Sequence, residues 1–88
     1  MKELKQRFIL RCVNDRDQLR AHQSGAPLTP ESLRSIVHRM AGAAGIFGFA
    51  DIGALAAALD ETLACDGDAS MLPQLIASLD EKIREHHA

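Results

Sequence analysis

Apolar residues recur at helical spacing along four stretches of this 88-residue chain, and short breaks separate the stretches. The first stretch covers about residues 2–22 and the second about residues 30–47. Asp51 is suited to cap a third helix, and a fourth begins near Ser70. Because no stretch shows the alternation typical of strands, the pattern predicts an all-α fold. Four helices with short connections pack most simply as an antiparallel up-down-up-down four-helix bundle.

The length allows one small domain with a single core, and we expect residues 1–88 to form it. No apolar run is long enough to cross a membrane, and the N-terminus lacks the apolar segment of a signal peptide. We therefore expect a cytoplasmic monomer without a membrane partner. The starting methionine and the ending EHHA favour a whole protein over a fragment.

The charge is slightly negative overall but unevenly distributed. A formal net charge of −2 argues against general nucleic-acid binding, which usually needs a basic surface. The first helical stretch is nevertheless basic, and a solvated face is the simplest interpretation of it. An adaptor that binds RNA or anionic lipid through this stretch is kept as the third hypothesis for function.

The sequence contains no recognisable metal-binding motif. Cys12 and Cys65 lie far apart, without the close cysteine or histidine spacing of a zinc site. We expect both to be buried, small apolar residues in a reducing compartment, although spacing alone leaves a disulfide between them open. We expect no metal ligands in this chain.

Three glycines follow one histidine closely in the stretch HRMAGAAGIFG. A glycine inside a helix costs about 1 kcal/mol relative to alanine, and alanines stand beside these glycines. Gly48 is placed to end the helix or bend it sharply. Gly42 and Gly45 need another explanation, since they lie within the expected helix.

The helical period places His38 on the solvent side of its helix. Leu33, Ile36, Met40 and Phe47 lie on the opposite side, which is the expected core face. The residues expected around His38 are small or cationic: Arg34, Ser35, Ala41, Gly42 and Gly45. A surface with so few side chains lets another macromolecule approach the imidazole closely. The alternative is an ordinary exposed histidine beside a fraying helix end.

These residues resemble the histidine phosphotransfer (HPt) domain of bacterial phosphorelays. The central helix of that family carries a histidine, a lysine three residues later, a glycine at the next position and a further glycine six residues on. His38, Gly42 and Gly48 match this pattern, as do the flanking sequences LRSIVHRM and GAAGIFGF. The close match covers about residues 33–60.

The resemblance implies that His38 accepts a phosphoryl group, through Nε2, from an aspartate of a response-regulator receiver domain. The histidine then passes the group to another receiver or returns it. Gly42 leaves room for the phosphate and the partner. The docking surface is expected to centre on His38 and to include part of the basic first helix. A hybrid histidine kinase is a further expected partner.

One position departs from the family pattern, because the usual lysine falls at Ala41. Either Arg34, one turn before His38, or Arg39, about 100° round the helix, is a candidate to replace it. Arginine suits phosphate because its forked donors bind two oxygens at once. The sequence favours Arg34 on the helical wheel but leaves the choice open.

The chain lacks the parts needed to phosphorylate itself from ATP. It has no glycine-rich phosphate loop, and no cluster of carboxylates for Mg²⁺ stands near His38 in the sequence. We therefore expect a phosphocarrier rather than an enzyme, without a cofactor of its own, and we expect Mg²⁺ only on the receiver. The main alternative is a non-catalytic docking module that binds a receiver or kinase without carrying phosphate.

Overall fold

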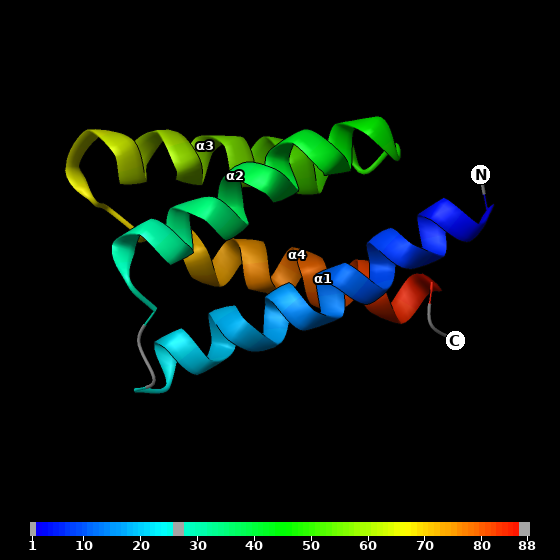
Figure 1. The fold of residues 1–88 in the computed structure, drawn as a ribbon, viewed down its shortest axis with the longest axis horizontal. Helices are drawn as coiled ribbons and strands as arrows, with labels where there is room; N and C mark the ends of the chain where they lie inside the picture. The colour runs from blue at the N-terminus through cyan, green and yellow to red at the C-terminus, as the bar shows by residue number, and fades with distance from the viewer. Residues whose placement is uncertain (1, 26–27, 87–88) are drawn as a thin grey trace.

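A computed structural model describes residues 2–25 and 28–86, with the side chain of Lys2 outside this description. These residues form helices α1 (Lys2–Gln23), α2 (Pro30–Ile46), α3 (Ala50–Asp66) and α4 (Leu72–His86) and contain no strand. The prediction of an all-α fold is therefore confirmed. Successive helices run in opposite directions along the long axis (Figure 1). None of the described helices is long and apolar enough to cross a membrane.

Local capping signals set the bounds of α2. Thr29 Oγ1 accepts a hydrogen bond from the backbone N–H of Ser32 at 3.1 Å, and Pro30 occupies the first turn, where it suits a helix. The helix ends at Ile46, and Phe47 is its C-cap rather than its last helical residue. Gly48 has a φ of +82°, a left-handed conformation that glycine adopts without strain.

Asp51 does not cap α3, so that part of the sequence prediction is wrong. Phe49 occupies the N-cap position, without a side-chain cap hydrogen bond, and its ring is buried. Burial of an apolar side chain therefore fixes the start of this helix where a polar cap was expected. Asp51 lies inside the first turn, where its Oδ1 accepts from the backbone N–H of Ile52 at 3.0 Å and its Oδ2 pairs with Lys82 Nζ at 3.5 Å.

Helix α4 begins at Leu72, slightly later than the predicted start near Ser70. The backbone N–H of Ser70 donates to Asp68 Oδ1 at 2.9 Å, so Ser70 belongs to the preceding turn. Pro73 lies in the first turn of α4 as expected, where its missing N–H leaves no hydrogen bond unmade.

The core is built from aliphatic side chains of all four helices. Leu33, Ile36 and Met40 of α2 are buried as predicted, whereas Phe47 is only partly buried and stacks on Phe8 with ring centroids 5.2 Å apart. Burying one such side chain contributes about 1.5–3 kcal/mol. The largest fully buried side chains are those of Cys12, Leu19, Val37, Ile52, Leu59, Leu75 and Leu79.

An ion-pair cluster joins α1 to α4 outside this core. Arg16 Nη1 lies 3.1 Å from Asp80 Oδ1, and Arg20 pairs with the other oxygen of the same carboxylate. Two cations of the basic first helix are therefore engaged within the bundle. Another, Lys5, places its Nζ 5.8 Å from the centre of the Phe49 ring.

Candidate functional site

His38 projects from the outward face of α2. Its side chain is 76% exposed, although its neighbour Val37 is completely buried. The same helix buries Leu33, Ile36 and Met40 on its opposite side. The orientation predicted from the helical period is therefore the one that the packing produces.

Asp60, on α3, contacts His38 and was not identified from the sequence. The distance from His38 Nδ1 to Asp60 Oδ2 is 2.9 Å. An ionised carboxylate can only accept a hydrogen bond, so Nδ1 carries the proton and donates it. In a neutral imidazole the other ring nitrogen, Nε2, then carries the lone pair. Asp60 thus favours the tautomer in which Nε2 is unprotonated and faces solvent.

The second oxygen of Asp60 is less well satisfied. Its Oδ1 is buried and has no hydrogen-bond partner among the described residues, and its closest cation is Arg34, with Nε at 3.8 Å. Buried polar atoms without hydrogen bonds are rare in folded proteins. Arg34, His38 and Asp60 therefore form one cluster, with a carboxylate between two basic side chains.

The surface beside His38 is as bare as the sequence indicates. A Cβ atom added to Gly42 or Gly45 would meet no heavy atom within 4 Å, so both glycines face open space. Gly53 of α3 is different, because an added Cβ would lie 3.6 Å from the carbonyl oxygen of Ala41. Gly53 thus faces α2 at ordinary van der Waals distance, whereas Gly42 and Gly45 leave the outer surface clear.

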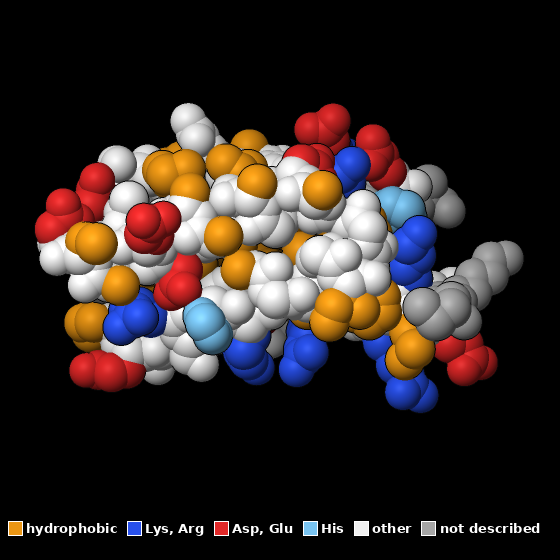
Figure 2. Space-filling model, turned by 90° about the horizontal axis from the view of Figure 1, so that it is seen from above, with side chains coloured by type: hydrophobic (Ala, Val, Ile, Leu, Met, Phe, Trp, Pro, Cys, Tyr) orange, Lys and Arg blue, Asp and Glu red, His pale blue; other side chains and the backbone are white. Residues whose placement is uncertain are grey.

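The remaining small residues lie where the helical period puts them. Ser35 is exposed, and Ala41 is half-buried on the side of α2 that packs against α3. Figure 2 shows the face over these two helices: few charged side chains lie at its centre, and Lys and Arg side chains gather along its lower edge.

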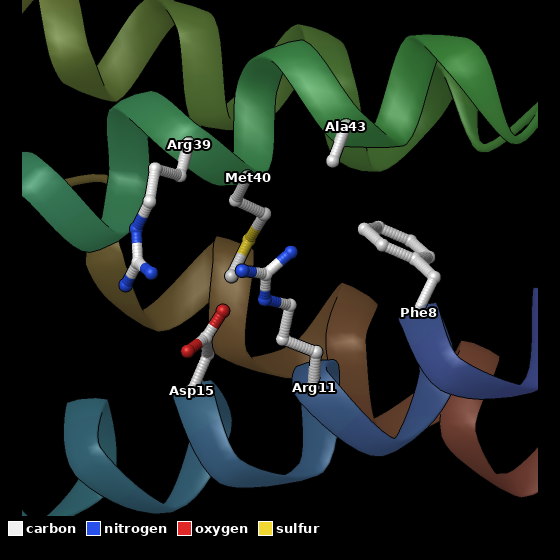
Figure 3. A pocket seen from close by; sticks show the side chains of 6 residues that line it. All are labelled: Phe8, Arg11, Asp15, Arg39, Met40 and Ala43. Atoms are coloured by element: carbon white, nitrogen blue, oxygen red, sulfur yellow. The ribbon is translucent and has the colours of Figure 1, made fainter. Parts of the chain in front are cut away.

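The two candidate arginines lie in different surroundings. Arg39 donates from Nε to the backbone oxygen of Ser35 at 3.4 Å and lines a small pocket between α1 and α2. In Figure 3 its guanidinium points towards α1, on the side of Asp15. Arg34 instead approaches the carboxylate that His38 contacts.

Asp15 is the buried acid of that pocket. It is 7% exposed, and burial raises the pKa of its carboxyl above the usual range. The positive charges of Arg39 and Arg11 oppose this rise in the Asp15 pKa but do not cancel it. Figure 3 shows both guanidiniums beside the carboxylate.

The two cysteines are free and differ in burial. Cys12 is buried as expected, and burial, with a smaller contribution from Asp15, raises the pKa of its thiol to about 12. The expectation for Cys65 is wrong, because this residue is exposed at the C-terminal end of α3, beyond the last core position of that helix. In the described ranges no group of three or more potential ligands is placed to hold a metal ion.

The comparison with protein families identifies one that matches this chain. The model of the Hpt domain matches residues 3–88. Comparisons with curated proteins and with solved structures gave no significant match. Because the match extends over nearly the whole chain, the protein belongs to the Hpt domain family, whose members are phosphocarrier modules that act with receiver domains and kinases in phosphorelays.

Proposed function

We propose that this chain is a phosphorelay intermediate that carries a phosphoryl group on Nε2 of His38. It acts as a single-domain, monomeric, antiparallel up-down-up-down four-helix bundle in the cytoplasm. The observation that carries the proposal is the 2.9 Å contact between His38 Nδ1 and Asp60, made by an imidazole that is otherwise exposed. Within the neutral ring, this contact favours the tautomer with the proton on Nδ1, which leaves the lone pair on Nε2, accessible to a partner.

The arrangement supports the following course of phosphoryl transfer to this ring. The Nε2 lone pair attacks the phosphorus of an aspartyl phosphate on the receiver, and the P–O bond to the aspartyl oxygen breaks as the N–P bond forms. The receiver carboxylate leaves with the electron pair, while the proton stays on Nδ1. The ring therefore gains positive charge, which Asp60 stabilises across the hydrogen bond. Return transfer reverses the same steps.

The receiver supplies what this chain does not. Phosphoryl transfer depends on positioning and on neutralisation of spreading charge, and we expect the receiver to bring both the Mg²⁺ and its carboxylate ligands. It docks over Ser35, Ala41, Gly42 and Gly45, where the surface is bare. We expect exposed cations of α1 to contribute to this docking surface, and a hybrid histidine kinase is a further expected partner that presents such a receiver.

A docking module without chemistry is the second candidate function. It is favoured by one observation, the alanine at position 41 where the family pattern has its lysine. This alternative predicts that a receiver binds equally well whether or not His38 is present, and that no acid-labile phosphate forms.

Labelling from phosphorylated receivers tests the proposal. A panel of receiver domains from the same organism is phosphorylated with ³²P and mixed, with Mg²⁺, with the wild type, with His38→Gln or with the matched control His86→Gln. We expect acid-labile label on the wild type and on His86→Gln, and none on His38→Gln. Label retained by His38→Gln would contradict the site. Binding of receivers without label on any variant would favour the docking module.

A further inference from the structure

We propose that Arg34 replaces the missing lysine as the cation that binds the phosphoryl group on His38, and that Asp60 holds Arg34 nearby until that group arrives. The inference rests on the proposed function, since it assigns a role in stabilising phosphohistidine. It also separates two arginines that the sequence leaves as alternatives.

The geometry around Asp60 supports a movable arginine. Arg34 lies one turn before His38 on the same helix face, where side chains four residues apart are neighbours. Its Nε is 3.8 Å from Asp60 Oδ1, too far for a good hydrogen bond. Its side chain is half exposed, and this long contact holds it less firmly than a hydrogen-bonded ion pair would. Arg34 can therefore leave Asp60 once another positive charge, that of the phosphorylated ring, lies beside the carboxylate.

Arg39 is held in a different place. Its Nε donates to the carbonyl oxygen of Ser35, and its guanidinium faces Asp15 and α1 (Figure 3). To reach a phosphoryl group on His38 it must give up the attraction of Asp15, a buried acid whose charge is already disfavoured by desolvation. The pocket therefore retains Arg39.

The charges balance in both states if Arg34 moves. Before transfer, Asp60 has Arg34 as its nearby cation and the neutral imidazole as its hydrogen-bond donor. After transfer, the phosphorylated ring is itself positively charged at Nδ1–H and neutralises Asp60. Arg34 is then free to donate its forked N–H groups to the phosphoryl oxygens. The charge of Asp60 is thus neutralised both before and after His38 is phosphorylated.

The test compares Arg34→Gln with Arg39→Gln, two substitutions on one helix that remove the same charge. With a phosphorylated receiver that labels the wild type, we measure the initial rate of transfer and the labelled fraction at equilibrium. We expect Arg34→Gln to lower the equilibrium ratio of phosphorylated to free protein about tenfold, the effect of losing one charge-assisted hydrogen bond. Arg34→Lys should restore most of it, and Arg39→Gln should stay within about twofold of the wild type.

Two further measurements exclude indirect effects. Circular dichroism melting of each variant checks the fold, and titration with the unphosphorylated receiver measures docking. If Arg34→Gln lost receiver affinity by the same factor as it lost labelling, the inference would be overturned, because the residue would then act in docking. The inference would also be overturned if Arg34→Gln were labelled as fully as the wild type, or if only Arg39→Gln lost label. Failure of the wild type itself to take label would instead contradict the proposed function, and this inference with it.

Discussion

Asp60 and Asp80 are similar acids in opposite halves of the bundle. Each is mostly buried, with 20% and 26% of its side chain exposed, and each faces two basic residues of a neighbouring helix. Both oxygens of Asp80 are paired, one with Arg16 at 3.1 Å and the other with Arg20. Asp60 has one well-made hydrogen bond, to His38, and one buried oxygen without a hydrogen-bond partner in the described part of the chain.

If the proposed function holds, this difference distinguishes a structural cluster, around Asp80, from a functional one, around Asp60. A carboxylate whose oxygens are both paired holds its partners in one arrangement. Moving either partner away leaves a partly buried charge without its counter-ion, which destabilises the fold. Asp60 has one hydrogen bond, to His38, and one longer ion pair, to Arg34, so it holds His38 more firmly than Arg34. Asp80 therefore joins α1 to α4, whereas Asp60 contacts an exposed imidazole, and in our proposal Arg34 moves from Asp60 to the phosphoryl group.

Replacing each aspartate by asparagine is the strongest test of this comparison. We expect Asp60→Asn to slow phosphoryl transfer to His38 at least about tenfold, as is typical when a residue that orients a reactive histidine is lost, with little change in stability. Asp80→Asn should lose about 1 kcal/mol of stability and transfer at the wild-type rate. Single-turnover labelling and urea unfolding of both variants measure the two effects.

The reverse outcome would break the comparison. If Asp60→Asn transferred normally but unfolded more easily, Asp60 would be a structural acid like Asp80. The ¹⁵N chemical shifts of the His38 ring give an independent check, since Asp60→Asn should weaken the preference for a proton on Nδ1.

The bare surface in front of His38 should matter next most. Gly42→Leu should slow transfer from a receiver by roughly tenfold, because the new side chain projects into the space that the receiver must occupy. The same substitution should not destabilise the helix, since glycine costs about 1 kcal/mol relative to good helix formers. Transfer kinetics and thermal unfolding measure these opposite changes.

Ala77→Leu is the matched control for this substitution. Ala77 is an exposed small residue of α4, and leucine there should leave transfer unchanged. Normal transfer by Gly42→Leu would show that the glycines do not serve partner approach.

Asp15 extends the comparison to an acid that is more buried than either of the others. Because burial raises its pKa in the folded state, deprotonation destabilises the fold as the pH rises above the unfolded pKa of about 4. Asp15→Asn should therefore raise the melting temperature by a few degrees at pH 7 and lose this advantage towards pH 3. Calorimetry across that range measures the effect, and a constant difference at all pH values would argue against it.

The sequence predicts features that depend on one helix and misses those that depend on two. The exposure of His38 follows from the period of its own helix, and that orientation is confirmed. Asp60 lies on another helix, and its contact with His38 depends on the relative position of α3 along α2, which no local sequence pattern encodes. The position of Arg39 likewise depends on α1, so the wheel alone could not separate it from Arg34.

The cap of α3 illustrates the same limit. Asp51 is a good cap by residue type, but the burial of Phe49 among α1 and α4 side chains sets the start of the helix. The prediction of a buried Cys65 is wrong because α3 continues past Leu59, its last buried residue, and ends at Asp66, with Gly67 as its C-cap.

The difference in burial between the two thiols makes Cys65 a selective site for attaching a dye. At pH 8 the Cys12 thiol is protonated and enclosed, since its pKa is about 12, so a maleimide dye added to the folded protein reacts at Cys65. Cys65 shares α3 with Asp60. A fluorophore there reports on the helix that contacts His38, and binding of a receiver can be followed in real time without any substitution in the sequence.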